Sequence, residues 1–289
     1  MRGKICMITG SNTGIGKETA LGLAKLGATI VMVCRDREKG EAAAAEISRR
    51  ASNPAVSLMV ADLSSQAQIR RLVGDFYEGR GVPSPGSRPK LDVLIHNAGV
   101  ILPQRRLTAD GIEAQFAVNH LAPFLLTHLL LDSLKAAAPS RIVVVASQVE
   151  SRGTIQFDDL QSEKSYAPLP VYFQSKLANV LFTYELARRL QGTGVTVNCL
   201  HPGVIATNLL SDYMAKPRAI GFLSKLSYPG PEKGAKPSIR LASDPALATT
   251  TGKYFKEMVE APTSKASNDQ ETARRLWKIS EELTGLPAA

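Results

Sequence analysis

Short apolar runs recur along the chain, and segments with the pattern of helices separate them. The runs are rich in Val, Ile and other apolar residues and lie at Ile5–Thr9, Thr29–Cys34, Val56–Ala61, Asp92–Ile95, Ile142–Ala146 and Val195–Leu200. Several are apolar at consecutive positions, which is typical of strands that helices cover on both faces. The alternation predicts an α/β fold with a doubly wound parallel sheet. A further run, Lys253–Phe255, indicates an edge strand, so we expect about seven strands, with a last helix from Gln270 to Leu283.

Two stretches break this alternation. Residues 79–89 hold three prolines and three glycines in eleven positions, which predicts a mobile surface loop. Residues 208–233 mix apolar side chains with three prolines. This composition predicts a lid that covers a substrate pocket. The sequence holds no internal repeat, and we expect a single domain over residues 1–289.

The composition is that of a globular protein, with 289 residues of which 44% are hydrophobic and 21% charged. Cys6, Cys34 and Cys199 each lie inside an apolar run, so we expect buried free thiols in a reducing compartment. No apolar run has the length of a membrane span, and a strand begins almost at Met1, which together predict a cytoplasmic protein. The four histidines lack metal-ligand spacing, and no metal is expected.

The net charge of +9 is compatible with nucleic acid, anionic lipid or an anionic small molecule as a partner. The basic residues are scattered, and aromatic residues make up only 6% of the chain. Stacking platforms for single strands are therefore not expected, and nucleic-acid binding is disfavoured.

A glycine-rich turn directly follows the first strand and opens a helical pattern at Lys17–Lys25. Its residues are Thr9, Gly10, Ser11, Asn12, Thr13, Gly14, Ile15 and Gly16. Such a turn lets the backbone approach a pyrophosphate, while the helix N-terminus offers free N–H groups to the anion. A glycine-rich turn without a ligand is the alternative. The position after the first strand favours a Rossmann-type dinucleotide site.

The end of the second strand bears on the choice of dinucleotide. An acidic side chain there holds a ribose 2′-hydroxyl, whereas a 2′-phosphate requires a guanidinium. In this chain the neutral Cys34 is followed by Arg35 and then Asp36. NADP(H) is therefore favoured over NAD(H), unless Arg35 merely precedes a solvated helix.

Tyr172 and Lys176 are four residues apart at the start of a helical pattern that continues to Leu190, so they share one helix face. A nearby ammonium favours phenolate and is expected to lower the pKa of the tyrosine toward the range of a general acid or base. A solvent-facing pair is the alternative. Ser147, at the carboxyl end of a predicted strand, is placed to hold a carbonyl oxygen, and Asn119 begins a helical run, where it could also be a simple N-cap.

With these motifs in order, the chain resembles the short-chain dehydrogenase/reductase family over nearly its whole length. The family's Asn-Ser-Tyr-Lys tetrad falls on Asn119, Ser147, Tyr172 and Lys176. Its adenine-side aspartate falls on Asp62, followed by Leu63. Its other motifs fall on the turn Thr9–Gly16, on Asn97-Ala98-Gly99, and on a segment that holds Pro202, Gly203, Val204 and Thr207.

Within that family the sequence is similar to the retinol dehydrogenase group, for example at Cys34-Arg35-Asp36 and Ser175–Leu181. The subgroup's strand end implies NADP(H). Three departures stand beside the match: His96 and Ala146 at positions where the family usually has Asn and Ser, and Ala122-Pro123 in place of Gly-His.

The resemblance implies an oxidoreductase that interconverts a carbonyl and its alcohol by hydride transfer. The substrate would be a lipophilic aldehyde or ketone, with a retinal-like compound as one example. Ser147 would hold the substrate oxygen, Tyr172 would transfer the proton, Lys176 would hold the nicotinamide ribose, Asn119 would support a water chain, and Thr207 would fix the carboxamide.

Two alternative functions stay open beside this interpretation. One is a regulator that senses NADPH without turnover, and the other is an epimerase or dehydratase of the related extended type. The apolar positions of residues 123–131 and of the helix after Tyr172 indicate either a subunit interface or ordinary core. Because the family often pairs through these helices, a homodimer is expected.

Overall fold

The computed structural model describes residues 1–82, 89–203 and 229–287. Its strands form one sheet in the order β3-β2-β1-β4-β5-β6-β7-β8, and all neighbours are parallel except β7 and β8. The strands are β1 (Ile5–Thr9), β2 (Thr29–Cys34), β3 (Val56–Val60), β4 (Val93–His96), β5 (Ser140–Val145), β6 (Val195–His201), β7 (Lys253–Lys256) and β8 (Val259–Glu260). The predicted doubly wound sheet is confirmed. The antiparallel β8 was not expected, because a two-residue exposed strand leaves no apolar pattern.

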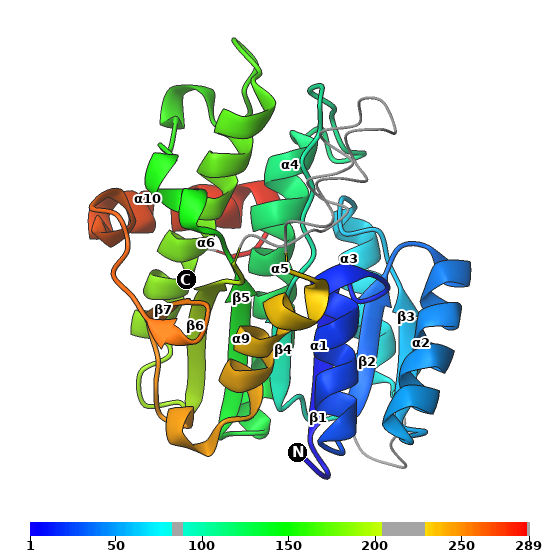
Figure 1. Cartoon of the computed structure of the whole chain (residues 1–289). Helices are drawn as coiled ribbons and strands as arrows, with labels where there is room; N and C mark the ends of the chain where they lie inside the picture. The colour runs from blue at the N-terminus through cyan, green and yellow to red at the C-terminus, as the bar shows by residue number, and fades with distance from the viewer. Residues whose placement is uncertain (83–88, 204–228, 288–289) are drawn as a thin grey trace.

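Helices cover both faces of the sheet, as Figure 1 shows. The helices on one face are α1 (Gly14–Lys25), α2 (Arg37–Ala51) and α9 (Pro231–Ser243). The opposite face carries α3 (Gln66–Tyr77), α5 (Ala122–Ala136), α6 (Pro168–Arg189) and α10 (Gln270–Thr284). Just before α5, the short α4 (Ala114–Phe116) leads into a π-turn at Ala117–Leu121.

Consecutive residues of the central strands point to opposite faces of the sheet and belong to two separate hydrophobic cores. Met7 packs with the α3 and α5 side, whereas Cys6 and Ile8 pack with α1. All three are fully buried. The strands are continuous apolar runs because helices cover both faces of the sheet, so side chains on either face are shielded from water. The three cysteines are buried free thiols, as predicted, and burial raises the pKa of Cys199 to about 12.

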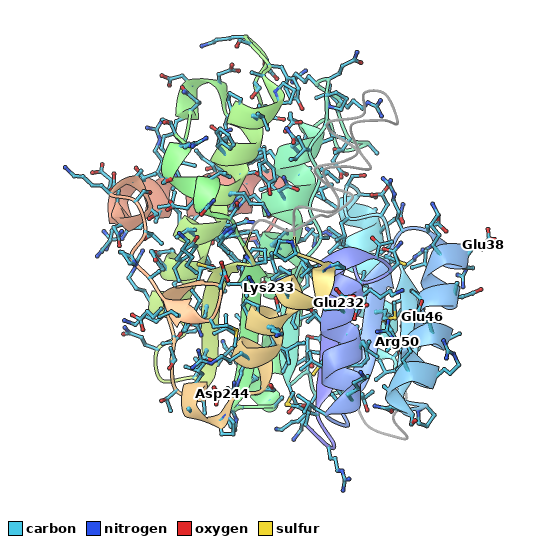
Figure 2. The ribbon with its side chains drawn as sticks, in the orientation of Figure 1. Glu38, Glu46, Arg50, Glu232, Lys233 and Asp244 are labelled. Atoms are coloured by element: carbon cyan, nitrogen blue, oxygen red, sulfur yellow. The ribbon has the colours of Figure 1, made fainter. Side chains whose placement is uncertain are left out.

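Polar side chains fix where several helices begin. Asp36, Ser65 and Asp269 accept backbone N–H groups of the first turns of α2, α3 and α10. Charged pairs then join α1 to α2: Lys17 Nζ lies 2.6 Å from Glu46, and Arg50 lies 3.2 Å from Glu18. Figure 2 shows Glu46 and Arg50 next to each other beside α1.

The C-terminal helix α10 packs on α6 and α5. Its Trp277 is 5% exposed and meets Phe124 at a ring-centroid distance of 4.9 Å and Phe182 at 6.0 Å. Its indole N–H donates to Glu281 at 2.7 Å, and the guanidinium of Arg189 lies 4.2 Å from its ring. Of the two interpretations of these apolar helix positions, the structure therefore supports intrachain core. The homodimer stays a prediction.

Among the described residues one helix, Ala114–Ala136, is long and apolar enough to be compared with a membrane span. Of its most apolar window, 72% is buried inside the protein, which is the burial of a core helix. The loop predicted at 79–89 and the lid predicted at 208–233 fall largely outside the described residues. At the end of the predicted lid, residues 231–233 form the first turn of α9 instead, where Pro231 supplies the fixed φ of an initial helical residue.

Trp277→Ala tests whether α10 is part of the core. Because the indole fills a cluster of aromatic rings, its removal should lower the free energy of unfolding by about 3–5 kcal/mol. The measurement is urea unfolding followed by far-UV circular dichroism, since Trp277 is the chain's single tryptophan and the variant loses its fluorescence probe. The exposed neighbour Lys278→Ala should stay within about 0.5 kcal/mol of the parent. Equal unfolding midpoints for both variants would contradict this packing.

Candidate active site

Six of the predicted site segments follow the carboxyl ends of neighbouring strands, whereas Asn119 precedes α5 and Tyr172 and Lys176 lie on α6. In sheet order, Asp62 follows β3, Arg35 follows β2, and the glycine-rich turn follows β1. Asn97, Ser147 and Pro202 come after β4, β5 and β6. The strand order reverses between β1 and β4, and this switch point is where doubly wound sheets bind their ligands. The fold therefore collects at one sheet edge residues that are far apart in the sequence.

The glycine-rich turn fits closely against the loop after β4. A Cβ on Gly10 would lie 2.8 Å from the Cα of Ala98, so only glycine allows this approach. Asn97 strengthens the contact, because its side-chain amide donates to the carbonyls of Thr9 and Gly10 at 2.9 and 3.0 Å. The predicted Asn97-Ala98-Gly99 element thus supports the turn from beneath.

The outer side of the same turn is open. Gly14 has φ of +56°, and a Cβ there would have no heavy atom within 4 Å. Thr13 is the N-cap of α1 but makes no side-chain hydrogen bond to it, and the first turn of α1 holds no acidic residue. The first N–H groups of α1 are therefore not capped by a side chain, in contrast to those of α2, α3 and α10. Free N–H groups at a helix N-terminus fit a phosphate.

The other residues of the turn divide between structure and surface. Ser11 is fully buried and donates to the carbonyl of Ile8 at 2.9 Å. Gly16 is buried beside Asn97. Asn12 and Ile15 are half-buried, and Thr13 is exposed. The predicted cradle thus has a buried base and an accessible rim.

Arg35 and Asp62 lie on the side of the turn away from the tetrad. Arg35 is exposed at the end of β2. Asp62 is half-buried and accepts the backbone N–H of Ser64 at 2.9 Å, while Leu63 packs against the core. Both residues are accessible, as the predicted adenine-ribose role requires.

Lys176 is buried, with 3% of its surface exposed, and its ammonium donates to the carbonyl of Val145 at 3.0 Å. Burial of a cation is unfavourable, and it lowers the pKa of Lys176 to about 8. A Cβ on Gly99 would lie 3.6 Å from this nitrogen and 3.4 Å from Oδ1 of Asn119. Lys176, Asn119 and Gly99 therefore meet at one point.

Tyr172 and Lys176 contact each other as their spacing predicted, with the ammonium 5.4 Å from the phenol ring centre. The expected effect on the tyrosine is wrong for the chain as it stands, because burial raises the pKa of Tyr172. The prediction counted the charge of the lysine and not the loss of water from around both groups. Sequence spacing places the pair on one face, but it does not show how deeply the fold buries that face.

Asn119 is not the N-cap that its place in the sequence allowed. It lies inside the π-turn at Ala117–Leu121 and is fully buried. Its side chain accepts the N–H of Val100 at 2.8 Å and donates to the carbonyl of Val100 and to Ser175 Oγ, both at 3.0 Å. Pro123, four residues later, has no N–H to donate to the carbonyl of Asn119.

Ser147 is half-buried two residues beyond the end of β5. Its Oγ accepts the N–H of Val149 at 3.4 Å, and in that role it keeps its own proton for another acceptor. Because Val145, two residues earlier, accepts the ammonium of Lys176, the end of β5 brings Ser147 to the tetrad lysine. Among the described residues nothing accepts the proton of this hydroxyl, so it is available to a substrate oxygen.

The last predicted segment is only partly described. β6 ends at His201, and Pro202 and Gly203 follow, with Gly203 at φ of +91° next to the side chain of Glu257. Val204 and Thr207 lie outside the described residues.

Two residues around the site were missed from the sequence. Ser175 links the tetrad, since it accepts from Asn119 and donates to the carbonyl of Tyr172 at 2.7 Å. Gln115 is fully buried and holds the approach to the site by accepting the N–H of Leu102 at 3.1 Å and donating to Tyr166 Oη at 3.0 Å. The only sequence signal was the position of Ser175 beside Lys176, because the contacts of Ser175 and Gln115 join distant segments.

Comparisons with known proteins agree with this geometry. The family model for the short chain dehydrogenases matches residues 4–218. Human retinol dehydrogenase 14 is 44% identical over 303 residues, covering 99% of this chain and 88% of that protein. Human retinol dehydrogenase 13 is 45% identical over 292 residues, covering 99% of this chain and 86% of that protein.

Solved structures show the same fold. An uncharacterized protein from Mycobacterium paratuberculosis superposes with a TM-score of 0.79 at 32% identity, covering 99% of this chain and 96% of that one. The NADP complex of RhlG from Pseudomonas aeruginosa superposes with a TM-score of 0.69 at 25% identity, covering 89% of this chain and 95% of that one.

The chain belongs to the short-chain dehydrogenase family, whose members use a nicotinamide dinucleotide. Within it the chain is most similar to the retinol dehydrogenase group. It is an oxidoreductase that acts on alcohol and carbonyl groups. The open turn at Gly14 and the uncapped start of α1 fit the dinucleotide pyrophosphate.

Lys176→Met tests the burial of the lysine through the pH dependence of stability. The pKa of Lys176 is about 8 in the folded chain against an ordinary 10.5, so the unfolded state binds more protons between these values and stability rises with pH there. The free energy of unfolding of the parent, minus that of Lys176→Met, should rise by roughly 2–4 kcal/mol from pH 8 to pH 10.5. Urea titrations at stepped pH measure it. A pH-independent difference would contradict the low pKa.

Proposed function

We propose that this chain is an NADP(H)-dependent reductase and dehydrogenase that interconverts a lipophilic aldehyde or ketone and its alcohol in the cytoplasm. The observation that carries the proposal is the cluster at the ends of β4 and β5. There, the ammonium of Lys176 lies over the Tyr172 ring and near Asn119. It donates to the carbonyl of Val145, two residues before Ser147. No observation favours a regulator without turnover or an epimerase.

The end of β2 supports NADP(H) over NAD(H). The acidic candidate for holding a ribose hydroxyl, Asp36, accepts the N–H of Lys39 at 3.0 Å and lies 3.3 Å from its ammonium. The backbone hydrogen bond from Lys39 lowers the pKa of Asp36, which is thereby committed to starting α2. Arg35 is exposed and available to a 2′-phosphate. The RhlG structure, at 25% identity, also holds NADP.

Bound along this edge, the cofactor would supply or accept the hydride at its nicotinamide ring. Ser147 would donate its free proton to the substrate oxygen and orient the carbonyl. Tyr172, whose raised pKa keeps it protonated, would give its proton to the developing alkoxide. Lys176, with a pKa of about 8, would then return a proton to the phenolate at physiological pH.

The names of the relatives support a lipophilic substrate, since the two human proteins at 44% and 45% identity are retinol dehydrogenases. A retinal-like aldehyde is therefore the first substrate to test.

Tyr172→Phe tests the proton-transfer role. The substitution removes only the transferable proton, so kcat for NADPH-dependent reduction of retinal should fall by about 10²–10⁴-fold while the KM for NADPH changes little. Absorbance at the nicotinamide band follows the reaction. Tyr77→Phe is the matched control, because its hydroxyl donates to Leu129 on the α3 and α5 side of the fold. Turnover of Tyr172→Phe at the rate of the control would refute the assignment.

Arg35→Ala tests the cofactor preference. Loss of a charged hydrogen bond to the 2′-phosphate should raise the KM for NADPH about 10- to 100-fold and leave the KM for NADH unchanged. Arg49→Ala makes the same charge change in the last turn of α2 and should leave both constants within about twofold. A parent enzyme that prefers NADH would overturn the proposed preference.

A further inference from the structure

The π-turn that carries Asn119 interrupts the regular hydrogen bonding of its helix. Its backbone hydrogen bonds span five residues and not four, as from the N–H of Ala122 to the carbonyl of Ala117. Pro123 has no N–H to donate to the carbonyl of Asn119, four residues earlier. Bonds from side chains of this turn to neighbouring elements therefore add to what fixes its position.

His120, the residue after Asn119, makes such a bond to the C-terminal helix. It is 1% exposed, and its ring lies among Phe116, Phe124 and Phe182 at centroid distances of 5.1 to 6.3 Å. Its Nε2 lies 2.9 Å from Oγ of Ser280 on α10. Because Ser280 donates its own proton to the carbonyl of Leu276 at 2.8 Å, its oxygen accepts the Nε2–H of His120.

The other side of the ring faces helix α6. Nδ1 of His120 and Oδ1 of Asn179 are both buried without a hydrogen-bond partner among the described residues. With the proton on Nε2, the Nδ1 atom is an acceptor. The bond through Nε2 to Ser280 is therefore the hydrogen bond by which the ring is attached to another helix.

Two consecutive residues of the π-turn thus bind two different helices. Asn119 binds Ser175 on α6, directly before Lys176, and His120 binds Ser280 on α10. The arrangement fixes the turn relative to the helix face that presents Tyr172 and Lys176.

We propose that His120 is a positioning residue, which holds Asn119 in register with Lys176 by binding Ser280 of α10. The catalytic consequence rests on the function proposed above, whereas the structural consequence does not. The C-terminal helix then contributes to turnover although its residue in this bond touches neither substrate nor cofactor.

The test uses four single variants of the full chain and the double variant that combines Ser280→Ala with His120→Asn. Ser280→Ala removes the bond from the α10 side, and His120→Asn removes it from the turn side while keeping an amide near the position of Nδ1. His120→Gln places an amide nitrogen near the position of Nε2 and retains the bond. Thr284→Val is the control, because Thr284 is a buried hydroxyl on α10 that donates to the carbonyl of Ser280 and not to the turn.

The first measurement is amide hydrogen exchange of peptides that cover residues 117–121, which needs no activity. Ser280→Ala and His120→Asn should speed exchange there by about tenfold or more, whereas His120→Gln and Thr284→Val should resemble the parent. The second is steady-state reduction. The first two variants should lose about 5- to 20-fold in kcat at a KM for NADPH within about twofold, and the double variant should lose no more than either single one.

The outcomes separate the two ideas. Unchanged exchange in Ser280→Ala and His120→Asn, or an equal effect in Thr284→Val, would overturn the positioning role. Faster exchange with unchanged kcat would show that the turn does not govern turnover and would also overturn it. A parent that reduces no carbonyl compound would refute the proposed function alone, and the exchange data would still decide whether α10 holds the turn.

Discussion

The bond from Lys176 to the carbonyl of Val145 joins the two halves of the catalytic apparatus. It fixes α6, which carries Tyr172, to the end of β5, which carries Ser147. This position is unfavourable for the charged ammonium, because burial removes it from water and lowers the pKa of Lys176 to about 8. A buried lysine with a pKa of about 8 gives up its proton more readily than an exposed one, which suits it to proton transfer.

The same edge of the sheet separates binding from chemistry. The side from β3 to β1 offers an open glycine turn, an uncapped helix and an exposed guanidinium, all of which suit a dinucleotide. The side from β4 to β6 offers buried, hydrogen-bonded side chains. The close approach of Gly10 to Ala98 and the Asn97 amide join the two sides.

Much of the site could be predicted because its residues come at strand ends or at helical spacing. The Gly10–Gly16 turn follows a strand, and Tyr172 and Lys176 are four apart, so local geometry alone brings each set together. The strand-to-helix alternation likewise predicted the parallel sheet. The two-residue β8 carries no such pattern, and the start of α9 was hidden within a proline-rich stretch.

The sequence by itself determined the fold class, the family and the residues that meet at the sheet edge, since short-range spacing and strand ends specify these. Only the tertiary structure decided the protonation of Tyr172 and Lys176, because desolvation depends on what covers a side chain. It also placed Asn119 inside a π-turn and Trp277 against Phe124, since packing between segments that are distant in the sequence leaves no local pattern.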